Sequence, residues 1–387
     1  MTEEFLMKKD KKKLVHILMS DYTLDSRVRN ETVSLFEDNY DVDVYCLKSE
    51  TINKNEIREG VSLRRFGKVG GKIVNFLTAY ISMFLYSLNK NIDCVHAHDV
   101  TSLPIAYLIS IFKRVPFIYD SHELWSQAHH ESSSKLILNT ISFFEKKIAK
   151  RATSIITVSD SIKKYLEEHF KVNNINVIRN IPSYTHLGKY DIFREKFGID
   201  QNTKICLYQG LISKTRGVEL IVEAALNICK SNDKVVFFFL GNGDYLEDLK
   251  HLVFEKDLTD QIKILGFIKQ DELLKYTMSA DIGIHAIYNS CLNHNYCLPN
   301  KVFEYIHSGV VLVVTNLVEL DRFVKENNIG VTFEDNNSKD LEIELNNILN
   351  NDKLFSEMKN NSIELAKKLT WENEYKKLKK IYGDIAC

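Results

Sequence analysis

The sequence has no excess of either charge. Its 51 Lys and Arg residues nearly balance its 52 Asp and Glu residues, and the formal net charge is -1. A chain with this balance has no overall attraction to nucleic acid or to an acidic surface. We therefore expect no nucleic-acid partner.

Long apolar runs are also missing. No run reaches the roughly 18 apolar residues that are needed to span a bilayer. The first apolar run, Leu14–Met19, follows a lysine-rich start and is too short for a signal-peptide core. These absences predict a cytoplasmic protein, with attachment to the inner face of a membrane as the alternative.

The cysteines give no sign of a disulfide framework. There are seven, an odd number, and they are scattered along the chain, which is typical of reduced thiols. Only Cys291-x-x-His294-x-x-Cys297 has ligand-like spacing, and it offers three ligands with no partner pair. We expect no metal site.

The length and apolar content of the chain indicate two domains. At 387 residues it exceeds the usual size of one domain, and 44% hydrophobic residues allow each half to bury a core. Apolar runs of strand length alternate with helical stretches, which predicts an α/β fold with parallel sheets. A segment with one of only four prolines, Arg179–Ser183, is the expected hinge. We predict domains at 1–183 and 184–369, followed by a terminal helix at 370–387.

One predicted helix in the second half begins with a misplaced cation. The stretch Pro299-Asn-Lys-Val-Phe-Glu-Tyr-Ile-His-Ser-Gly309 lies between two apolar runs of strand length. Lys301 opposes the partial positive charge of the helix start, and a bound phosphate would resolve this conflict. Glu304 lies one turn further on the same face, where its carboxylate can accept hydrogen bonds from vicinal hydroxyls. The pair indicates a nucleotide, and the alternative is an ordinary amphipathic helix.

Arg216 stands at a second helix start. It follows the predicted strand Lys204–Gln209 and precedes a predicted helix at Gly217–Cys229, so a phosphate is again favoured there. Nearby, the Gly241-Asn-Gly243 turn after an apolar strand allows close approach of backbone to a ligand, although this signal is weak alone.

The first half brings polar side chains to strand ends. Asp25, Ser26 and Arg27 follow the first strand and are expected in a loop that forms a wall of the site. Two later strands end in His-Ala-His98-Asp99 and Asp-Ser-His122-Glu. Because carboxyl ends of parallel strands share one edge of a sheet, we predict that His122 and Asp99 lie close together.

The segment Leu298-Pro-Asn-Lys-Val-Phe-Glu304-Tyr, followed by Ser308-Gly309, resembles the donor-binding motif of the retaining GT-B glycosyltransferases of family 4. The resemblance implies two Rossmann-like domains whose parallel sheets face a cleft. It also implies that Glu304 holds a ribose and that Asn300, Lys301 and the preceding loop hold a diphosphate. Many members carry another Glu eight residues earlier, where this chain has Tyr296.

Other segments extend the resemblance. The stretch from Gly210 to Arg216 is similar to the family's Gly-loop-basic-Gly motif, whose basic side chains stabilise the departing diphosphate. Leu211 occupies the place of the first basic residue, so Arg216 and Lys301 are expected to share the task. Gly243 and Ile268 follow strands at places where family members hold the donor, the latter through backbone groups around the base.

The first half is similar to the amino-terminal domain of these enzymes. A His that matches His122 lies beside the transferred sugar in the family. Asp25, Ser26, Arg27 and Asp99 are then expected on the acceptor side. The paired glycines that the family often carries in its first loop are missing here.

The resemblance implies a metal-independent transfer from a UDP-, GDP- or similar nucleotide sugar, with no further cofactor. The acceptor would be a glycan or a lipid-linked molecule in bacterial-type surface polysaccharide or glycoconjugate synthesis. Fixed cations stabilise the leaving diphosphate, so His122, Arg216 and Lys301 are the expected catalytic residues. No second carboxylate presents itself as a nucleophile, in keeping with the front-side attack proposed for the family.

Two other functions stay open on the same scaffold. A non-catalytic partner of another transferase is favoured by Tyr296 and Leu211, and a sugar-nucleotide epimerase would need no acceptor. A dehydrogenase is disfavoured because no Gly-x-Gly-x-x-Gly follows the first strand.

One long apolar stretch has two interpretations. Residues 62–72 carry Arg64, Arg65, Lys68 and Lys72, and they lead into a helical apolar stripe. The stripe consists of Ile73, Phe76, Leu77, Tyr80, Ile81, Phe84 and Leu88. It predicts a core-facing helix. The alternative is a basic, aromatic-rich edge in peripheral contact with an anionic membrane.

Overall fold

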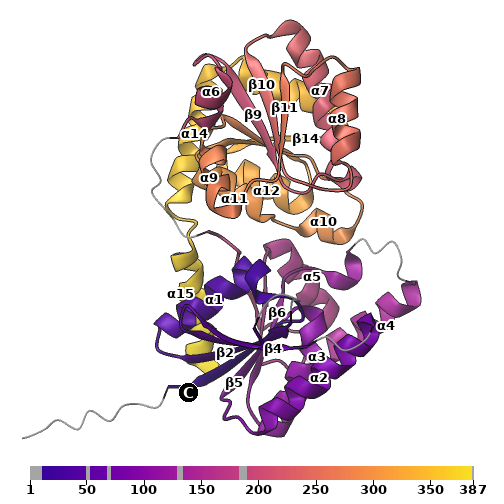
Figure 1. Ribbon diagram of the computed structural model, residues 1–387, viewed down its shortest axis with the longest axis vertical. Helices are drawn as coiled ribbons and strands as arrows, with labels where there is room; N and C mark the ends of the chain where they lie inside the picture. The colour runs from indigo at the N-terminus through magenta and orange to yellow at the C-terminus, as the bar shows by residue number, and fades with distance from the viewer. Residues whose placement is uncertain (1–10, 49–52, 68–70, 129–133, 183–189, 386–387) are drawn as a thin grey trace, which may run out of the picture. The chain divides into compact units, whose positions relative to one another are not determined.

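The computed structural model describes residues 11–48, 53–67, 71–128, 134–182 and 190–385. They form two compact α/β units, each with its own sheet (Figure 1). The first unit comprises Met1–Ser126, His130–Asn180 and Tyr375–Cys387, and the second comprises Gln127–His129 and Ile181–Glu374. The predicted domain boundary lies at the edge of residues 183–189, outside the described residues.

The first unit is built on an eight-stranded sheet with the order β3-β4-β2-β1-β5-β6-β7-β8. Neighbouring strands are parallel except for the antiparallel pair β3 and β4. The strands are β1 (Lys13–Ile17), β2 (Asp41–Leu47), β3 (Asn55–Arg58), β4 (Val61–Phe66), β5 (Cys94–His98), β6 (Phe117–Ser121), β7 (Ser154–Thr157) and β8 (Ile175–Val177). The helices are η1 (Tyr22–Leu24), α1 (Ser26–Glu37), α2 (Lys72–Leu88), α3 (Asp99–Lys113), η2 (Trp125–Gln127), α4 (Lys135–Ala149), α5 (Asp160–Phe170) and the final α15 (Trp371–Ile385).

The second unit is built on a six-stranded parallel sheet with the order β11-β10-β9-β12-β13-β14. Its strands are β9 (Lys204–Gln209), β10 (Val235–Leu240), β11 (Ile262–Gly266), β12 (Ile282–His285), β13 (Val311–Thr315) and β14 (Gly330–Phe333). Its helices are α6 (Ile192–Phe197), η3 (Lys214–Arg216), α7 (Val218–Ser231), α8 (Leu246–Glu255), α9 (Gln270–Met278), α10 (Leu292–Tyr296), α11 (Asn300–His307), α12 (Val318–Asn327), α13 (Ser338–Leu349) and α14 (Asp352–Ala366).

Side-chain alternation along the strands gives the second unit two cores, one on each face of its sheet. Phe237 and Phe239 of β10 pack with α7 and α13 on one face, whereas Phe238 and Leu240 pack with α11 and α12 on the other. A sheet covered on both faces needs near-continuous apolar strands, and this is the pattern seen in the sequence. The predicted α/β fold with two parallel sheets is therefore confirmed.

Helix α2 departs from the predicted core-facing stripe. Ala79 and Met83 are buried against the unit, but Leu77, Ile81 and Leu88 of the predicted stripe are exposed. The helix is apolar almost all round, and only one side of it can face the sheet, so periodicity alone did not identify the buried side. Within the described residues, no helix combines the length and the apolar composition that a membrane crossing requires.

Candidate active site

The structure has the predicted helix start at Lys301, for which phosphate binding stays a prediction. Helix α11 runs from Asn300 to His307, and Pro299 precedes it in extended conformation, so Lys301 lies in the first turn. Val302, Phe303, Tyr305 and Ile306 bury one face of the helix in the core. Lys301 and Glu304 lie on the remaining face and are half-buried, which holds both close to the strand ends.

Lys301 lies against the loop that follows β9. Its Nζ atom is 4.5 Å from the centroid of the Tyr208 ring. A Cβ atom at residue 210 would lie only 2.8 Å from the same Nζ, so the ammonium group occupies the space that Gly210 leaves. Burial, and next the charge of Arg216, lower the pKa of Lys301 to about 7, while Glu304 acts in the opposite direction. The charge of Arg216 therefore acts on Lys301, and we call these two residues the cation pair.

His285, at the end of β12, joins the cation pair and was not found from the sequence. It is fully buried, and neither ring nitrogen has a hydrogen-bond partner among the described residues. Burial, followed by the charges of Lys301 and Arg216, holds the pKa of His285 well below its usual range, so the ring is neutral. The buried Nε of Arg216 likewise has no partner in the described part of the chain. An unpaired buried donor costs about 1–3 kcal/mol, so these groups favour a ligand that accepts hydrogen bonds.

The carboxylate of Glu304 is oriented from β9. The Gln209 side-chain amide donates to Glu304 Oε2 at 2.5 Å, and the Thr277 hydroxyl donates to Gln209 Oε1 at 2.7 Å. The backbone N–H of Gln209 donates to the Tyr305 hydroxyl at 3.1 Å. Gln209 ends strand β9 and Thr277 lies in helix α9, and neither belongs to a motif. The sequence therefore did not predict that they orient Glu304.

The glycine turn after β10 packs against the loop that follows β9. A Cβ atom at Gly243 would lie 2.0 Å from the backbone oxygen of Ile212, and one at Gly241 would lie 1.8 Å from that of Gly210. The N–H of Ile212 donates to Asn242 O at 3.0 Å. The glycines thus let two loops pack backbone to backbone, whereas close approach to a ligand stays a prediction.

The other donor-side candidates are placed less specifically. Asn300 is exposed at the first position of α11, and Ile268 packs its side chain on the core of the unit. Tyr296 ends α10 and is half-buried, and Leu211 is 53% exposed. Nothing in these contacts assigns a role to the four side chains.

His122 in the first unit lies beside Asp99, as the strand spacing predicts. The Asp99 carboxylate accepts from the His122 backbone N–H at 3.0 Å and lies 3.3 Å from Nδ1, while Asp120 lies 3.1 Å from Nε2. Asp99 has a φ of 62°, a left-handed conformation that is strained for a residue with a side chain. Burial would lower the pKa of His122, but Asp99 and Asp120 raise it to about 10. The ring is therefore an imidazolium with both N–H groups engaged.

The predicted loop conformation is wrong at Ser26 and Arg27, which form the first turn of α1, while the acceptor-side role of Asp25 and Ser26 stays a prediction. Asp25 caps this helix by accepting from Val28 N at 3.0 Å, and the cap fixes where the helix begins. Arg27 is buried, and its guanidinium donates to both carboxylate oxygens of Asp120 at 2.8 and 2.9 Å. It neutralises a buried carboxylate instead of lining an exposed wall.

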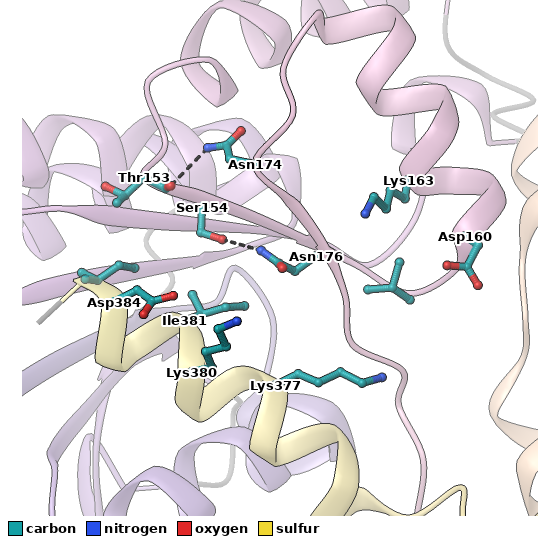
Figure 2. A pocket seen from close by; sticks show the side chains of 12 residues that line it. Thr153, Ser154, Asp160, Lys163, Asn174, Asn176, Lys377, Lys380, Ile381 and Asp384 are labelled. Atoms are coloured by element: carbon teal, nitrogen blue, oxygen red, sulfur yellow. Dashed lines mark hydrogen bonds between the residues drawn. The ribbon is translucent and has the colours of Figure 1, made fainter.

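A polar cavity of about 570 Å³ lies elsewhere in the first unit. It is lined by α15, α5 and the edge strands, where Asn174 donates to Thr153 O and Asn176 donates to Ser154 Oγ (Figure 2). None of the predicted site residues lines it. The volume of this cavity therefore lends no support to the predicted site.

The Cys291-x-x-His294-x-x-Cys297 segment uses its polar atoms locally. His294 Nδ1 lies 3.0 Å from Ser290 Oγ, and Cys297 Sγ lies 3.1 Å from His294 O. Among the described residues, groups of His, Asp and Glu close enough to share an ion occur only in the first unit, around His98.

Comparison with known proteins connects these features to one family. The family model described as Glycosyltransferase Family 4 matches residues 26–181, and the model described as Glycosyl transferases group 1 matches residues 189–365. An alpha-monoglucosyldiacylglycerol synthase from Acholeplasma laidlawii is 22% identical over 277 residues, which cover 67% of this chain and 68% of that protein.

Solved structures share the fold. Sucrose-phosphate synthase from Thermosynechococcus elongatus superposes with a TM-score of 0.79 at 16% identity, covering 97% of this chain and 99% of that one. HepE from Anabaena in complex with UDP gives 0.77 at 14% identity, covering 96% and 100%. The two family models together span most of the chain, and the fold agrees with them over nearly its full length. The chain is a glycosyltransferase and belongs to family 4 of the enzymes with the GT-B fold.

Proposed function

We propose that the chain transfers a sugar from a nucleotide diphosphate sugar and that the cation pair holds the diphosphate. The supporting observation is the lowered pKa of Lys301, which burial and Arg216 together cause. Two cations held together are a poor arrangement for stability and a good one for an anion. HepE, a structural neighbour, was solved with UDP, which agrees with a nucleotide donor.

In this proposal the cation pair acts on the leaving group. Negative charge accumulates on the diphosphate as the glycosidic bond breaks, and fixed cations stabilise that state more than the ground state. Neutral His285 donates a further hydrogen bond from its otherwise unpartnered ring, and Asn300 and the N–H groups at the start of α11 complete the phosphate contacts. Glu304, held by Gln209, accepts from the ribose hydroxyls. The backbone around Ile268 contacts the base.

The Lys301→Met and Arg216→Met variants test this assignment. Each should lower transfer by roughly 10²–10³-fold, the loss seen when one charge-stabilising donor is removed from an active site. Far-ultraviolet circular dichroism should be unchanged. Lys250→Met is the matched control, because Lys250 is an exposed lysine of the same unit that pairs with Glu247. Turnover near the native rate in both test variants would refute the proposal.

We infer that His122 contributes a fixed positive charge beside the transferred sugar. An imidazolium whose two N–H groups face Asp99 and Asp120 has no lone pair for a general base. The acceptor oxygen then bonds to the anomeric carbon on the face from which the diphosphate departs, and the hydroxyl proton passes to the departing diphosphate oxygen. Attack on that face retains the anomeric configuration, and the step needs no metal. A product with inverted configuration, or activity lost in EDTA, would contradict this mechanism.

We infer a glycan or lipid-linked acceptor, used in surface polysaccharide or glycoconjugate synthesis at a membrane. One relative is named as a synthase of a glucosylated diacylglycerol. Three neighbouring helices of the first unit, α2, α3 and α4 (Figure 1), also carry exposed apolar side chains, which we call the apolar face. The rings of Phe84 on α2 and Phe112 on α3 are in contact, with their centroids 4.9 Å apart. The apolar face comprises Val74, Leu77, Ile81, Leu85 and Leu88 of α2, Leu108, Ile111 and Phe112 of α3, and Leu136, Ile137, Phe143 and Phe144 of α4.

Positive charge borders this face on α4. Lys147 lies over the Phe143 ring at 4.5 Å, and Lys146 is in the same turn. Arg65, predicted for the basic edge, is buried and paired with Glu56 at 2.8 Å. Lys68 and the side chain of Lys72 lie outside the described residues. Exposed apolar side chains beside lysines match the interface of an anionic bilayer.

Vesicle sedimentation tests the apolar face. We expect the chain to sediment with phosphatidylglycerol vesicles more than with phosphatidylcholine vesicles, and the double variant Leu77→Glu with Ile81→Glu should lose this binding. Ile57→Glu is the matched control, because Ile57 is equally apolar and exposed in the same unit but lies on β3. Equal binding by the double variant and the control would exclude the apolar face.

A further inference from the structure

A chain of hydrogen bonds runs through the interior of the first unit to the site histidine. His122 Nε2 lies 3.3 Å from His98 Nδ1, and His98 Nε2 lies 2.9 Å from His16 Nδ1. His16 Nε2 lies 3.1 Å from the hydroxyl of Tyr382, which in turn lies 2.7 Å from His96 Nδ1. His16, His96, His98 and Tyr382 are all at most 1% exposed. Water therefore has no access to the inner links.

Each link fixes the next. Burial holds the pKa values of His16 and His96 well below their usual range and lowers that of His98, so these three rings are neutral. A neutral imidazole has one donor and one acceptor nitrogen, and a hydroxyl has one hydrogen to donate. Once one ring carries its proton on a given nitrogen, the tautomers of its neighbours are fixed, and all hydrogen bonds of the chain point in the same direction. The Tyr382 hydroxyl is the link between His16 and His96.

The two directions differ at the site end. In one, His122 donates to His98 Nδ1, and the donors then run inward through Tyr382. In the other, His98 Nδ1 carries the hydrogen and faces Asp120 Oδ2 at 3.5 Å, the atom that also faces His122. The tautomer of His98 therefore decides how the Asp120 carboxylate is shared with His122.

Some of these residues are also close enough together to bind a metal ion, but their contacts favour the hydrogen-bond chain. One ligand atom each from His16, Glu31, His96 and His98 lie within 4.8 Å of one another. However, both nitrogens of His16 already have partners, and the Arg27 guanidinium lies 3.2 Å from Glu31. A metal would break two hydrogen bonds and sit beside a fixed cation.

We propose that Tyr382 is a positioning residue for His122 and that it acts through His16 and His98. The proposal rests on the function proposed above, in which His122 acts on the sugar. In this proposal helix α15 contributes to the reaction, because it carries Tyr382 and places its hydroxyl beside His16 and His96 of the sheet. The hydroxyl of Tyr375 and the ammonium group of Lys379 hold the same helix to Asp38 at 3.1 and 2.7 Å.

Tyr382→Phe tests the proposal in the full-length chain, and Tyr375→Phe is its matched control on the same helix. Long-range ¹H–¹⁵N spectra of protein labelled at histidine report the tautomer of each ring. We expect Tyr382→Phe to change the His98 tautomer signature and to lower kcat by about tenfold with an unchanged KM for the donor, the upper end of what one hydrogen bond between neutral groups gives. Tyr375→Phe should leave both within twofold.

A second variant guards against a folding defect. His16→Gln breaks the chain one link nearer to the site, and it should reproduce the loss of kcat while the circular dichroism spectrum stays native. An unchanged His98 signature in Tyr382→Phe would overturn the proposal, and so would a changed signature with native kcat. One bound zinc per purified chain would also overturn it. Because the spectra need no turnover, they test the chain of bonds even if Lys301→Met proves fully active and the proposed function fails.

Discussion

The two units treat their charged groups in opposite ways. In the first, Arg27 is matched by Asp120 and Glu31, and His122 is matched by Asp99 and Asp120. In the second, burial and the charge of Arg216 lower the pKa of Lys301, and His285 adds a buried ring with no partner among the described residues. Each cation of the first cluster thus faces a carboxyl group, although both oxygens of the buried Glu31 lack a hydrogen-bond partner among the described residues. In the second cluster the charge of Arg216 acts on Lys301, and Glu304 offsets it in part.

This contrast separates structure from binding. Burial would raise the pKa of Asp120, but Arg27 and His122 hold it well below its usual range, so the carboxylate stays charged inside the protein. Such a group is bound to its neighbours and contributes to a fixed arrangement. Lys301 is instead pushed toward neutrality, and a diphosphate would reverse that shift. In the proposed function, the first unit supplies a preorganised framework and the second supplies the ligand's charge partners.

The largest effect on stability is expected from removing a cation from the Arg27, Asp120 and Glu31 cluster of the first unit. Arg27→Met leaves Asp120 buried without its cation, which should lower stability by about 3–5 kcal/mol. Hydrogen exchange of the β5 and β6 amides, measured by mass spectrometry, reads this loss within the first unit. Arg29→Met is the control on the same helix: the Arg29 pair with Glu59 is exposed, and its loss should cost below about 1 kcal/mol. Equal effects of the two substitutions would remove the distinction between the clusters.

A smaller effect, on nucleotide affinity, is expected from removing the carboxylate of Glu304 beside the cation pair. Glu304→Ala removes one acceptor for ribose hydroxyls and should weaken binding of a nucleoside diphosphate by about tenfold, near 1.4 kcal/mol. Binding of inorganic pyrophosphate should not change, because it has no ribose. Titration calorimetry with both ligands sharpens the assignment, and an equal loss for both would place Glu304 among the phosphate contacts.

Much of this could be predicted from the sequence, because the information is local. Apolar runs of strand length predicted both sheets. Pro299 marked a helix start, and Lys301 in its first turn is unfavourable for the helix dipole, which pointed to a ligand. Proximity of His122 to Asp99 followed from parallel strands that end at one edge.

The rest depends on contacts between distant segments. Tyr382 contacts His16, which is 366 residues away in the sequence, and Arg27 contacts Asp120, which is 93 residues away, so neither pairing has a local pattern. His285 looked like one more residue of a buried strand. Helix α2 was ambiguous because apolar residues surround it, and only the sheet beneath decides which side is covered.

Calorimetry of nucleotide-sugar binding as a function of pH tests the central claim most directly. Lys301 has a pKa near 7 in the free protein, and a bound diphosphate should raise it. The diphosphate diester of the donor does not titrate near neutrality, so binding at pH 8.5 should take up close to one proton. The affinity should then fall by up to about tenfold per pH unit above 7. Lys301→Met should abolish both the uptake and the slope. The same affinity at pH 6.5 and 8.5 in the native chain, with no proton uptake, would contradict the account.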